Sequence, residues 1–597
     1  MTCFSSWSHT PLRRVLALAL LAGAAPVGLA AQRAEPRPAD WVPPLASLMT
    51  PGGSELRDVV ERFTLDRSAL LRRFDVANGR RRQAALEGYY SVWDGRLPEA
   101  DFARLGLQGR ADWILLKNRI ARERALLALD AKRTAEMSPL LPFAAAVRDL
   151  QERRRQLEMP VPDSVARTLA RITTTIADAK KAVEGGTSTG SRIVAHRAAN
   201  EATALRELLK RWYEYHAGYD PMFTWWAKSP YEKAAEALEG YTRTLREKLG
   251  GWKQGEEEPI VGDPIGREAL LADLRFEMIP YTPEELVRIA EREFAWCEAE
   301  MKKASRAMGF GDDWKAALEK VKTLHAGPGK QPQVVRDLAF EAIEFVEQRN
   351  LVTIPPLAKE IWRMEMLSPE QQRVSPFFLG GEVIRVSFPT DAMLQDEKLM
   401  SMRGNNVHFS RATVQHELIP GHHLTGFMGN RSNPHRGAFS TPFWTEGWAL
   451  YWEMLLWDLD FPRSPEDRVG MLFWRSHRAA RIMFSLGFHL GTMTPQQAID
   501  LLVDRVGHER ANATAEVRRS FNGSYSPLYQ VAYMMGGLQF RALHQELVKS
   551  GRMTDKAFHD AVLATNSMPV EMVRAAITNQ RLAQDHVPSW RFAGELR

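Results

Sequence analysis

The residues most able to do chemistry are a cluster of imidazole and carboxylate side chains. The eight residues from His416 to His423 include Glu417 and His422, and Glu446 follows 24 residues after His422. Two histidines and a downstream glutamate form the ligand set of catalytic zinc sites, which leave the fourth position for water. A glutamate directly after the first histidine is placed to take a proton from that water. The cluster therefore predicts one Zn²⁺ ion bound by His416, His422 and Glu446, with Glu417 as the general base.

The spacing differs from the pattern H-E-x-x-H, in which two histidines four positions apart share one helical face. His416 and His422 are six positions apart, about 600° of helical rotation, so on a straight helix their rings would point apart. His423 returns to the face of His416 but lies roughly 10 Å further along the axis. Between them, Pro420 interrupts helical hydrogen bonding and Gly421 accepts unusual backbone angles. We therefore expect a broken helix that lets His416 and His422 share an ion. His423 is the next choice of ligand, or a supporting or substrate-binding residue.

Each of these residues also has a non-catalytic explanation. His416 and Glu417 alone could form a capped helix end with a salt-bridged glutamate, and Glu446 could be an acid at the start of a surface helix. The neighbours of Glu446 are apolar and aromatic, however, and a carboxylate is costly there unless it is paired with a charge or a metal. The metal explanation is therefore favoured. His408 and His435 are expected to lie at the surface or to support the site indirectly.

Tyrosines late in the chain could stabilise the negative charge that develops on a substrate carbonyl oxygen. Tyr533 is our candidate, with Tyr529 and Tyr525 as alternatives. Tyr529 and Tyr533 are four positions apart and would share a helical face, but two aromatic core residues explain the spacing equally well. Arg518 and Arg519 could bind a substrate carboxylate, although surface salt bridges are the better expectation for both.

The elements that must position these side chains are mostly helical. Apolar residues recur at helical spacing through residues 54–250 and again from Arg411 to the C-terminus. A loop rich in Gly, Glu and Pro at 251–264 separates a helical N-terminal region (54–250) from a helical catalytic region (265–597). We expect both regions to form one peptidase-like unit around a cleft.

Strand patterns occur shortly before the histidine cluster. Residues 351–354 precede two prolines, and residues 380–388 alternate apolar and polar side chains. These patterns predict a small β-sheet beside the active-site helix, in a fold that is otherwise mostly α. An edge strand could bind an extended peptide through its backbone, or the sheet could serve only for packing. Capping boxes at Thr282 and Thr494 predict the starts of two helices.

The N-terminus has the features of a secretory signal peptide over residues 1–31, followed by a Pro-rich linker at 32–53. Arg13 and Arg14 precede a short apolar run, which ends before the small residues that a signal peptidase recognises. The apolar run is too short for a stable membrane anchor. We therefore expect an exported, periplasmic or extracellular protein without a membrane anchor in the mature chain.

Composition excludes several other classes of protein. Of the 597 residues, 45% are hydrophobic and 25% are charged, as in ordinary soluble globular proteins. The net charge of +6 is small for this length, and the basic runs fit solvated helix faces better than a nucleic-acid surface. Signal cleavage would remove Cys3 and leave Cys297, so no internal disulfide is expected. Cys297 fits a buried helix residue better than a nucleophile.

Several segments together resemble a bacterial family known as domain of unknown function 885. They are HELIPGHH, TEGWALY, PLYQVAYMMGG, FHDAVLATNSMPVEMV, DWILLKN and YTPEELVRIAERE. The family is grouped with gluzincin-type metallopeptidases, which include angiotensin-converting-enzyme-like and oligopeptidase-like helical folds. The resemblance implies that His422, preceded by Gly421, is the second zinc ligand and that Glu446 is the third, and it favours a tyrosine as oxyanion donor. The longer histidine spacing and Leu450, where many gluzincins have an acid, depart from that pattern.

Together these observations predict an exported zinc metallopeptidase that hydrolyses short peptides, with Glu417 activating the metal-bound water. The limit on peptide length comes from the fold analogy, because a helical shell around a deep cleft excludes folded proteins. One alternative is a zinc hydrolase of another amide or ester. Another is a non-catalytic peptide-binding protein that kept the fold. The presence of Glu417 argues against the second alternative, because a binding protein needs no base there.

Overall fold

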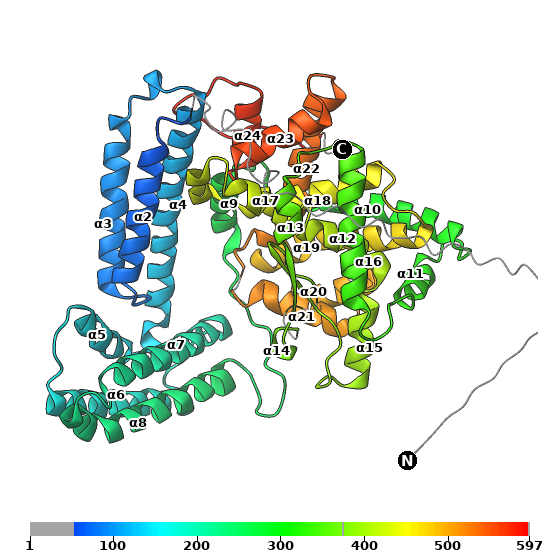
Figure 1. The fold of residues 1–597 in the computed structure, drawn as a ribbon. Helices are drawn as coiled ribbons and strands as arrows, with labels where there is room; N and C mark the ends of the chain where they lie inside the picture. Colours follow the sequence, from blue (N-terminus) through cyan, green and yellow to red (C-terminus); the bar gives the residue numbers. More distant parts are fainter. Residues whose placement is uncertain (1–52, 373–374, 376, 524, 595–597) are drawn as a thin grey trace, which may run out of the picture.

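The computed structural model describes residues 53–372, 375, 377–523 and 525–594. The expected signal peptide (1–31) and all but the last residue of the expected linker (32–53) lie outside these residues. The described chain is mostly helical and has one two-stranded parallel sheet (Figure 1), which confirms the expectation of a mostly α fold with a small β-sheet.

The elements run as follows. The N-terminal helices are α2 (Arg57–Arg73), α3 (Arg80–Arg96), α4 (Leu107–Met137), α5 (Ala144–Arg155), α6 (Pro162–Glu184), α7 (Arg192–His216) and α8 (Pro221–Thr244). The elements up to the histidine cluster are α9 (Gly266–Phe276), α10 (Pro283–Ala307), α11 (Trp314–Lys322), α12 (Gln331–Gln348), α13 (Pro356–Ile361), β1 (Arg363–Met366), α14 (Pro369–Gln372), β2 (Val383–Val386) and α15 (Gln395–Gly404).

The remaining helices are α16 (Val407–Glu417), α17 (His422–Gly429), α18 (Pro442–Asp458), α19 (Pro465–His489), α20 (Pro495–Leu501), α21 (Arg510–Phe521), α22 (Tyr529–His544), α23 (Asp555–Thr565) and α24 (Val570–Ile577). Short 3₁₀ turns are η2 (Leu97–Glu99), η3 (Phe102–Arg104), η4 (Ser138–Leu140) and η6 (Pro434–Phe439). Short π-helical turns are η5 (Leu245–Leu249), η7 (Leu502–Val506) and η8 (Gln545–Lys549).

The N-terminal helices form two groups (Figure 1). Helices α2–α4 stand side by side, and α5–α8 form a separate group at the end of α4. The long helix α4 joins them: Trp113 packs in the main hydrophobic core of the molecule, whereas Met137 packs in the core of α5–α8 with Leu169 and Leu209. Two hydrophobic cores are therefore connected through one continuous helix.

The centre of the larger body is α19, which is buried along nearly its whole length. Helices α10, α16 and α22 pack against it. The predicted capping boxes are present at the starts of α10 and α20, where Thr282 and Thr494 accept hydrogen bonds from the backbone N–H groups of Glu285 and Gln497. Capping satisfies N–H groups that have no partner within the helix. Cys297 lies buried on α10 as expected, and burial raises the pKa of its thiol to about 12.

A buried ion pair joins the N-terminal helices to the larger body. Asp112 on α4 is fully buried, and its two carboxylate oxygens each lie 2.8 Å from a side-chain nitrogen of His435 or Arg436 in the turn before α18. A buried carboxylate needs such partners because desolvation is otherwise unfavourable. His435 therefore has a structural role that connects residues more than 300 positions apart in the chain.

The sheet consists of β1 and β2, paired in parallel from Arg363 opposite Val383 to Met366 opposite Val386. The predicted strand at 380–388 is thus present in part, as β2. Its inner face packs on α12 and α16, next to the histidine cluster. On the side away from β1, Arg385 pairs with Leu379, so the sheet edge nearer the histidine cluster is already covered at that point.

The predicted strand at 351–354 is wrong. Two of its backbone groups bond to α23 instead of a neighbouring strand: Asp560 accepts a hydrogen bond from the N–H of Thr353, and His559 Nδ1 donates to Leu351 O at 2.7 Å. Asp560 also accepts a hydrogen bond from the Thr353 hydroxyl. The second strand is β1, whose residues Arg, Met, Glu and Met have little strand character and are mostly exposed.

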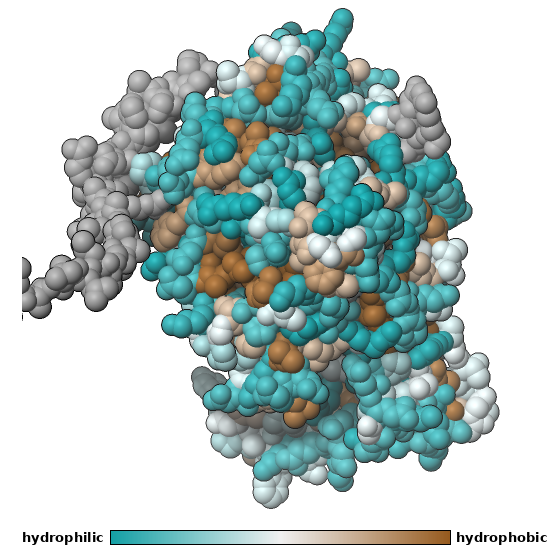
Figure 2. All heavy atoms as spheres, turned by 90° about the vertical axis from the view of Figure 1, so that its right-hand side faces the viewer, coloured by the Kyte–Doolittle hydropathy of each residue, from teal (hydrophilic) through white to brown (hydrophobic). Residues whose placement is uncertain are grey.

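The face that carries α10–α12 and α15 is mainly hydrophilic, with small scattered hydrophobic patches (Figure 2). Within the described residues, every helix is too short or too polar to cross a membrane.

Candidate metal centre

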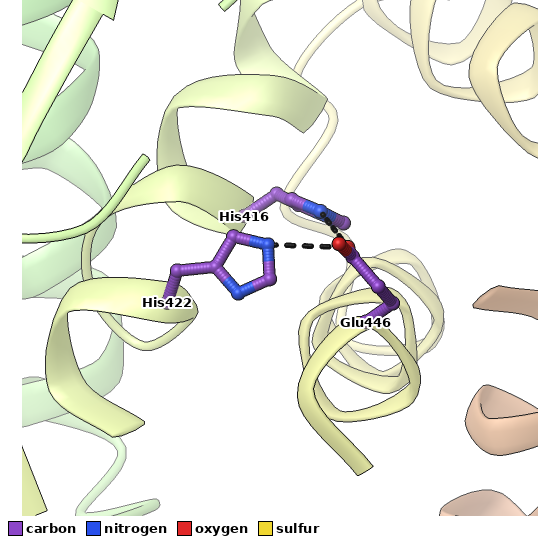
Figure 3. A group of neighbouring side chains, drawn as sticks. All are labelled: His416, His422 and Glu446. Atoms are coloured by element: carbon purple, nitrogen blue, oxygen red, sulfur yellow. Dashed lines mark ion pairs between the residues drawn. The ribbon is translucent and has the colours of Figure 1, made fainter. Parts of the chain in front are cut away.

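Three helices bring His416, His422 and Glu446 together. His416 lies in the last turn of α16, His422 is the first residue of α17, and Glu446 lies in the first turn and a half of α18. Their side chains converge on one point (Figure 3), and each offers a potential ligand atom within 4.8 Å of the other two. The structure thus assembles the three residues that the sequence suggests as metal ligands.

The helix break expected between His416 and His422 is present. Helix α16 ends at Glu417, the Ile419–Pro420 peptide bond is cis, and α17 starts at His422. Gly421 touches the carbonyl oxygen of His416 so closely that any side chain at this position would collide with it. Because of this turn, the rings of His416 and His422 lie 4.8 Å apart and almost perpendicular to each other.

His423 points away from this centre. Its Nε2 lies 2.7 Å from the carbonyl oxygen of Ala358, and the side chain is buried. His408 also lies elsewhere, with its Nδ1 2.7 Å from an oxygen of Asp467. Among the three histidines that the cluster offers, His416 and His422 are therefore the pair that faces Glu446.

Glu446 lies between the two imidazoles. Its Oε2 is 3.4 Å from His416 Nε2 and 3.2 Å from His422 Nε2. This oxygen is buried and has no hydrogen-bond partner among the described residues. Burial opposes ionisation of Glu446, but the two imidazoles outweigh burial and hold its pKa well below the usual range. Two imidazole nitrogens beside a carboxylate oxygen form a ligand set that is typical of zinc.

Glu453 forms a hydrogen bond with the ring nitrogen of His416 that faces away from Glu446. His416 Nδ1 lies 2.7 Å from Glu453 Oε1, which also lies 3.4 Å from Arg478 Nη2. Burial lowers the pKa of His416, but Glu446 and Glu453 together raise it to about 9 in the metal-free protein. Histidine ligands commonly donate their second N–H to a carboxylate, which fixes the tautomer and the ring orientation. Sequence analysis missed Glu453, although it lies seven residues, or two helical turns, after Glu446.

Glu417 lies at the rim of the same group of side chains. Its Oε2 is 4.0 Å from His422 Nε2, and its side chain is only 13% exposed. Gly380 packs so closely against it that a side chain there would collide with the carboxylate. Burial raises the pKa of Glu417, which makes the carboxylate a better proton acceptor.

Tyrosines of α22 and of the loop before it lie on the other side of the centre. The Tyr529 hydroxyl donates a hydrogen bond to Glu446 Oε1. The ring of Tyr533 lies 6.2 Å from the ring of His416 and nearly parallel to it. Tyr525 stacks on Tyr529 at 4.3 Å. Burial raises the pKa of Tyr533, so its hydroxyl stays protonated and can donate a hydrogen bond.

A glycine contact sets the distance between α18 and α22. Gly447 directly follows Glu446, and its Cα packs against Gly536, which lies one turn after Tyr533. A side chain on either glycine would collide with the backbone of the other helix. The absence of side chains at both positions lets the tyrosines reach Glu446.

The centre opens into a cavity of about 350 Å³. The cavity is lined by the candidate metal ligands, Glu417, the three tyrosines and three arginines. The lining residues include Phe377, Leu379, Gly380, His416, Glu417, His422, Glu446, Tyr525, Tyr529, Tyr533, Arg478, Arg481 and Arg519. The surface salt bridge expected for Arg518 is present, with Glu257. Arg519 also forms a salt bridge, with Glu516, but the expected surface position is wrong, because its side chain is only 12% exposed and lines the cavity.

Comparison with known proteins gives a family and a fold. The family described as "Bacterial protein of unknown function (DUF885)" matches residues 66–577. No curated protein matches the chain. A candidate lipoprotein of unknown function from Shewanella oneidensis is 19% identical, with a TM-score of 0.65 over 88% of this chain and 100% of its own. A candidate lipoprotein from Colwellia psychrerythraea is 17% identical, with a TM-score of 0.48 over 76% of each chain.

Proposed function

The chain belongs to this family of bacterial proteins of unknown function, DUF885, and we propose from its own site that it is a zinc-dependent peptidase. The observation that carries the proposal is the position of Glu446 Oε2, buried between His416 Nε2 and His422 Nε2 without a hydrogen-bond partner among the described residues. Two imidazole nitrogens and one carboxylate oxygen fit zinc in number and in chemistry.

A zinc ion on these ligands would lower the pKa of a bound water to about 7 and act as a Lewis acid toward a carbonyl group. Glu417 has the position and the raised pKa of a general base. It would accept the proton of the attacking water and pass it to the leaving amine. The hydroxyl group of Tyr533 is the available donor for the carbonyl oxygen as it gains negative charge, because the Tyr529 hydroxyl already donates to Glu446.

Hydrolysis of peptides is favoured by the resemblance of the Gly421-His422 and Glu446 positions to those of gluzincin-type metallopeptidases. A mostly helical fold with a site inside a cavity is compatible with a metallopeptidase-like unit that admits short peptides. A zinc hydrolase of another amide or ester would use the same residues. A non-catalytic peptide-binding protein would have no use for Glu417 inside the cavity.

We also propose that the protein is exported to the periplasm or beyond. Residues 1–31 have the features of a signal peptide. The similar structure from Shewanella oneidensis is described as a candidate lipoprotein, a class of protein that is exported.

The test combines metal analysis with hydrolysis of short peptides. The purified wild type is expected to contain about one zinc ion per chain. His422→Ala should lose this zinc, whereas His423→Ala should keep it, because His423 bonds to Ala358 O. Glu417→Gln should keep zinc and lose hydrolysis by about 10²- to 10⁴-fold. Full zinc retention in His422→Ala would remove His422 from the ligand set, and unchanged hydrolysis in Glu417→Gln would refute the mechanism.

A further inference from the structure

The cavity contains three guanidinium groups that the proposed hydrolysis does not use. Arg478 and Arg481 lie three positions apart on α19 and therefore share a helical face. Arg519 reaches the same cavity from α21. Arg478 and Arg481 are 4% and 2% exposed, although arginine is rarely buried unless it is paired. Their presence beside the candidate metal ligands therefore requires an explanation.

These three arginines form ion pairs with two carboxylates, Glu516 and Glu453. Glu516 Oε1 lies 2.8 Å from Arg481 Nε, and Glu516 Oε2 lies 2.7 Å from Arg519 Nε. Within the part of the chain that the structure describes, Glu453 is the acidic partner of Arg478, at 3.4 Å, and it also forms a hydrogen bond with His416. Among the described residues, Arg478 Nε and Arg481 Nη1 are buried without a hydrogen-bond partner.

Three arginines and two carboxylates give an excess of one positive charge, and the other ionisable groups of the cavity do not remove it. A tyrosine side chain has an ordinary pKa of about 10, so the phenols of Tyr529 and Tyr533 are neutral near pH 7. Glu417 and Glu446 together carry the two negative charges that balance a divalent cation. Three guanidinium groups against Glu453 and Glu516 therefore leave one positive charge without a counter-charge in the occupied site. A buried unpaired charge is unfavourable, so an anionic group of the substrate would stabilise it.

We propose that Arg478, Arg481 and Arg519 form a carboxylate-binding subsite, so that the substrates are short peptides with a free C-terminus, cut close to that end. The planar guanidinium group binds carboxylates through two parallel hydrogen bonds, which suits this role. Arg519 is the donor with access to the cavity, and the two arginines of α19 supply charge beside it. This inference rests on the proposed function and deepens it.

The size of the cavity agrees with a small substrate. A volume of about 350 Å³ is near the lower end of the range of about 300–1,000 Å³ that proteins use for small ligands. A peptide that occupies this space with its carboxylate at the arginines has few residues left between that end and the candidate zinc ligands. An acidic side chain near the end of a peptide offers the same chemistry, and the experiment must separate the two sources.

The test compares N-acetylated tripeptides in three forms: the free acid, the C-terminal amide, and the amide with a glutamate as last residue. Binding to the Glu417→Gln variant, measured by calorimetry, is expected to be at least about tenfold tighter for the acid than for the plain amide. Tight binding of the glutamate amide would show that the subsite prefers an acidic side chain and would overturn the terminal-carboxylate assignment. Equal binding of the acid and both amides would overturn the subsite as a whole.

Variants locate the subsite within the cavity. Arg519→Gln should lose the preference for the acid, whereas Arg518→Gln on the same helix should keep it, because Arg518 pairs with Glu257 outside the cavity. Thermal unfolding of both variants shows whether they are folded. If Arg519→Gln is unstable, the comparison of acid and amide binding to Glu417→Gln still decides whether the cavity prefers a carboxylate. Retention of the full preference in a folded Arg519→Gln would contradict the assignment.

The two proposals fail in different ways. If hydrolysis depends on zinc and Glu417 but acids and amides are bound and cut equally well, the peptidase proposal stands and the carboxylate subsite is wrong. If Glu417→Gln hydrolyses peptides at the wild-type rate, the peptidase mechanism is wrong whatever the arginines bind.

Discussion

Glu453 Oε1 lies 2.7 Å from His416 Nδ1, on the side of the imidazole that faces away from Glu446. The hydrogen bond directs the Nδ1 proton to Glu453, so that Nε2 is left as the coordinating atom once a metal replaces its proton. The same oxygen of Glu453 lies 3.4 Å from Arg478 Nη2. One carboxylate thus connects the candidate metal ligands with the arginines of the cavity.

Glu453→Gln should weaken zinc binding by about 10- to 100-fold. The amide can still accept a hydrogen bond, but it no longer stabilises the orientation and basicity of His416 through its charge. Competition with a chelator of known affinity measures the effect. Asp458→Asn is the matched control, because it removes another carboxylate of α18 that pairs with Arg541 far from the centre. Equal zinc affinity in wild type and Glu453→Gln would show that Glu453 serves only the fold.

The tyrosine variants should divide into two kinds. Tyr533→Phe is expected to keep zinc affinity and to lower kcat by about 10²- to 10³-fold if its hydroxyl stabilises the oxyanion. Tyr529→Phe should change zinc affinity as well, because its hydroxyl bonds directly to Glu446. Steady-state kinetics and zinc titration of both variants separate the effects, and Tyr525→Phe, which keeps the stacked ring, tests the remaining cavity hydroxyl. A wild-type kcat in Tyr533→Phe would remove Tyr533 as the oxyanion donor and leave Tyr525, which also lines the cavity, as the next candidate.

Gly536→Ala should destabilise the protein by about 1–3 kcal/mol, because the added methyl group collides with the backbone of α18. It should also separate Glu446 from Tyr529 and so reduce activity. Urea unfolding measures the first effect. Gly426→Ala on α17 is the control, since no atom lies within 4 Å of the added methyl group; it should be neutral or slightly stabilising. Equal stability of Gly536→Ala and the wild type would contradict the close approach of the two helices.

Acid should destabilise the fold through His559. Burial lowers the pKa of this histidine to about 4, whereas an exposed histidine has a pKa of about 6.5. Between these two pH values His559 binds a proton in the unfolded chain but not in the folded chain. The contribution of neutral, buried His559 to the free energy of unfolding is therefore complete above about pH 6.5 and is lost as the pH falls to about 4. The loss is about 3 kcal/mol at most.

His559→Gln should therefore show a smaller decrease in unfolding free energy between pH 7 and pH 5 than the wild type. Urea titrations at the two pH values measure the difference. His586→Gln replaces a histidine that is nearer the surface and serves as the control. An unchanged pH dependence in His559→Gln would mean that other groups account for the acid sensitivity.

The sequence predicts the parts of the site that depend on local rules. The break at Pro420 and Gly421 follows from the backbone properties of those two residues, and the starts of α10 and α20 follow from Thr282 and Thr494 with their capping partners. Each of these features is decided within a few residues. The mostly helical fold is predictable for the same reason, because apolar spacing is a local signal.

Features that depend on distant partners were not predictable. Residues 351–354 look like a strand, but Asp560 and His559, more than 200 positions later, bond to two of their backbone groups. Arg518 and Arg519 are adjacent in sequence, and only the packing of α21 decides which of them turns into the cavity. Glu453 could have been found by following the helical face two turns beyond Glu446 to the next acid.

The buried Asp112 has a consequence for the order in which the protein can fold. A ribosome makes α4 long before it makes His435 and Arg436, the residues that neutralise Asp112. Until then, burying this face of α4 would enclose an unpaired carboxylate, so the helix must remain partly hydrated while more than 300 further residues are added. Contacts between such distant segments form slowly, because the intervening chain loses entropy when they close. The cavity, which Tyr533 of α22 completes, is therefore a late product of folding, and an N-terminal fragment that ends before Glu446 lacks one of the three candidate zinc ligands.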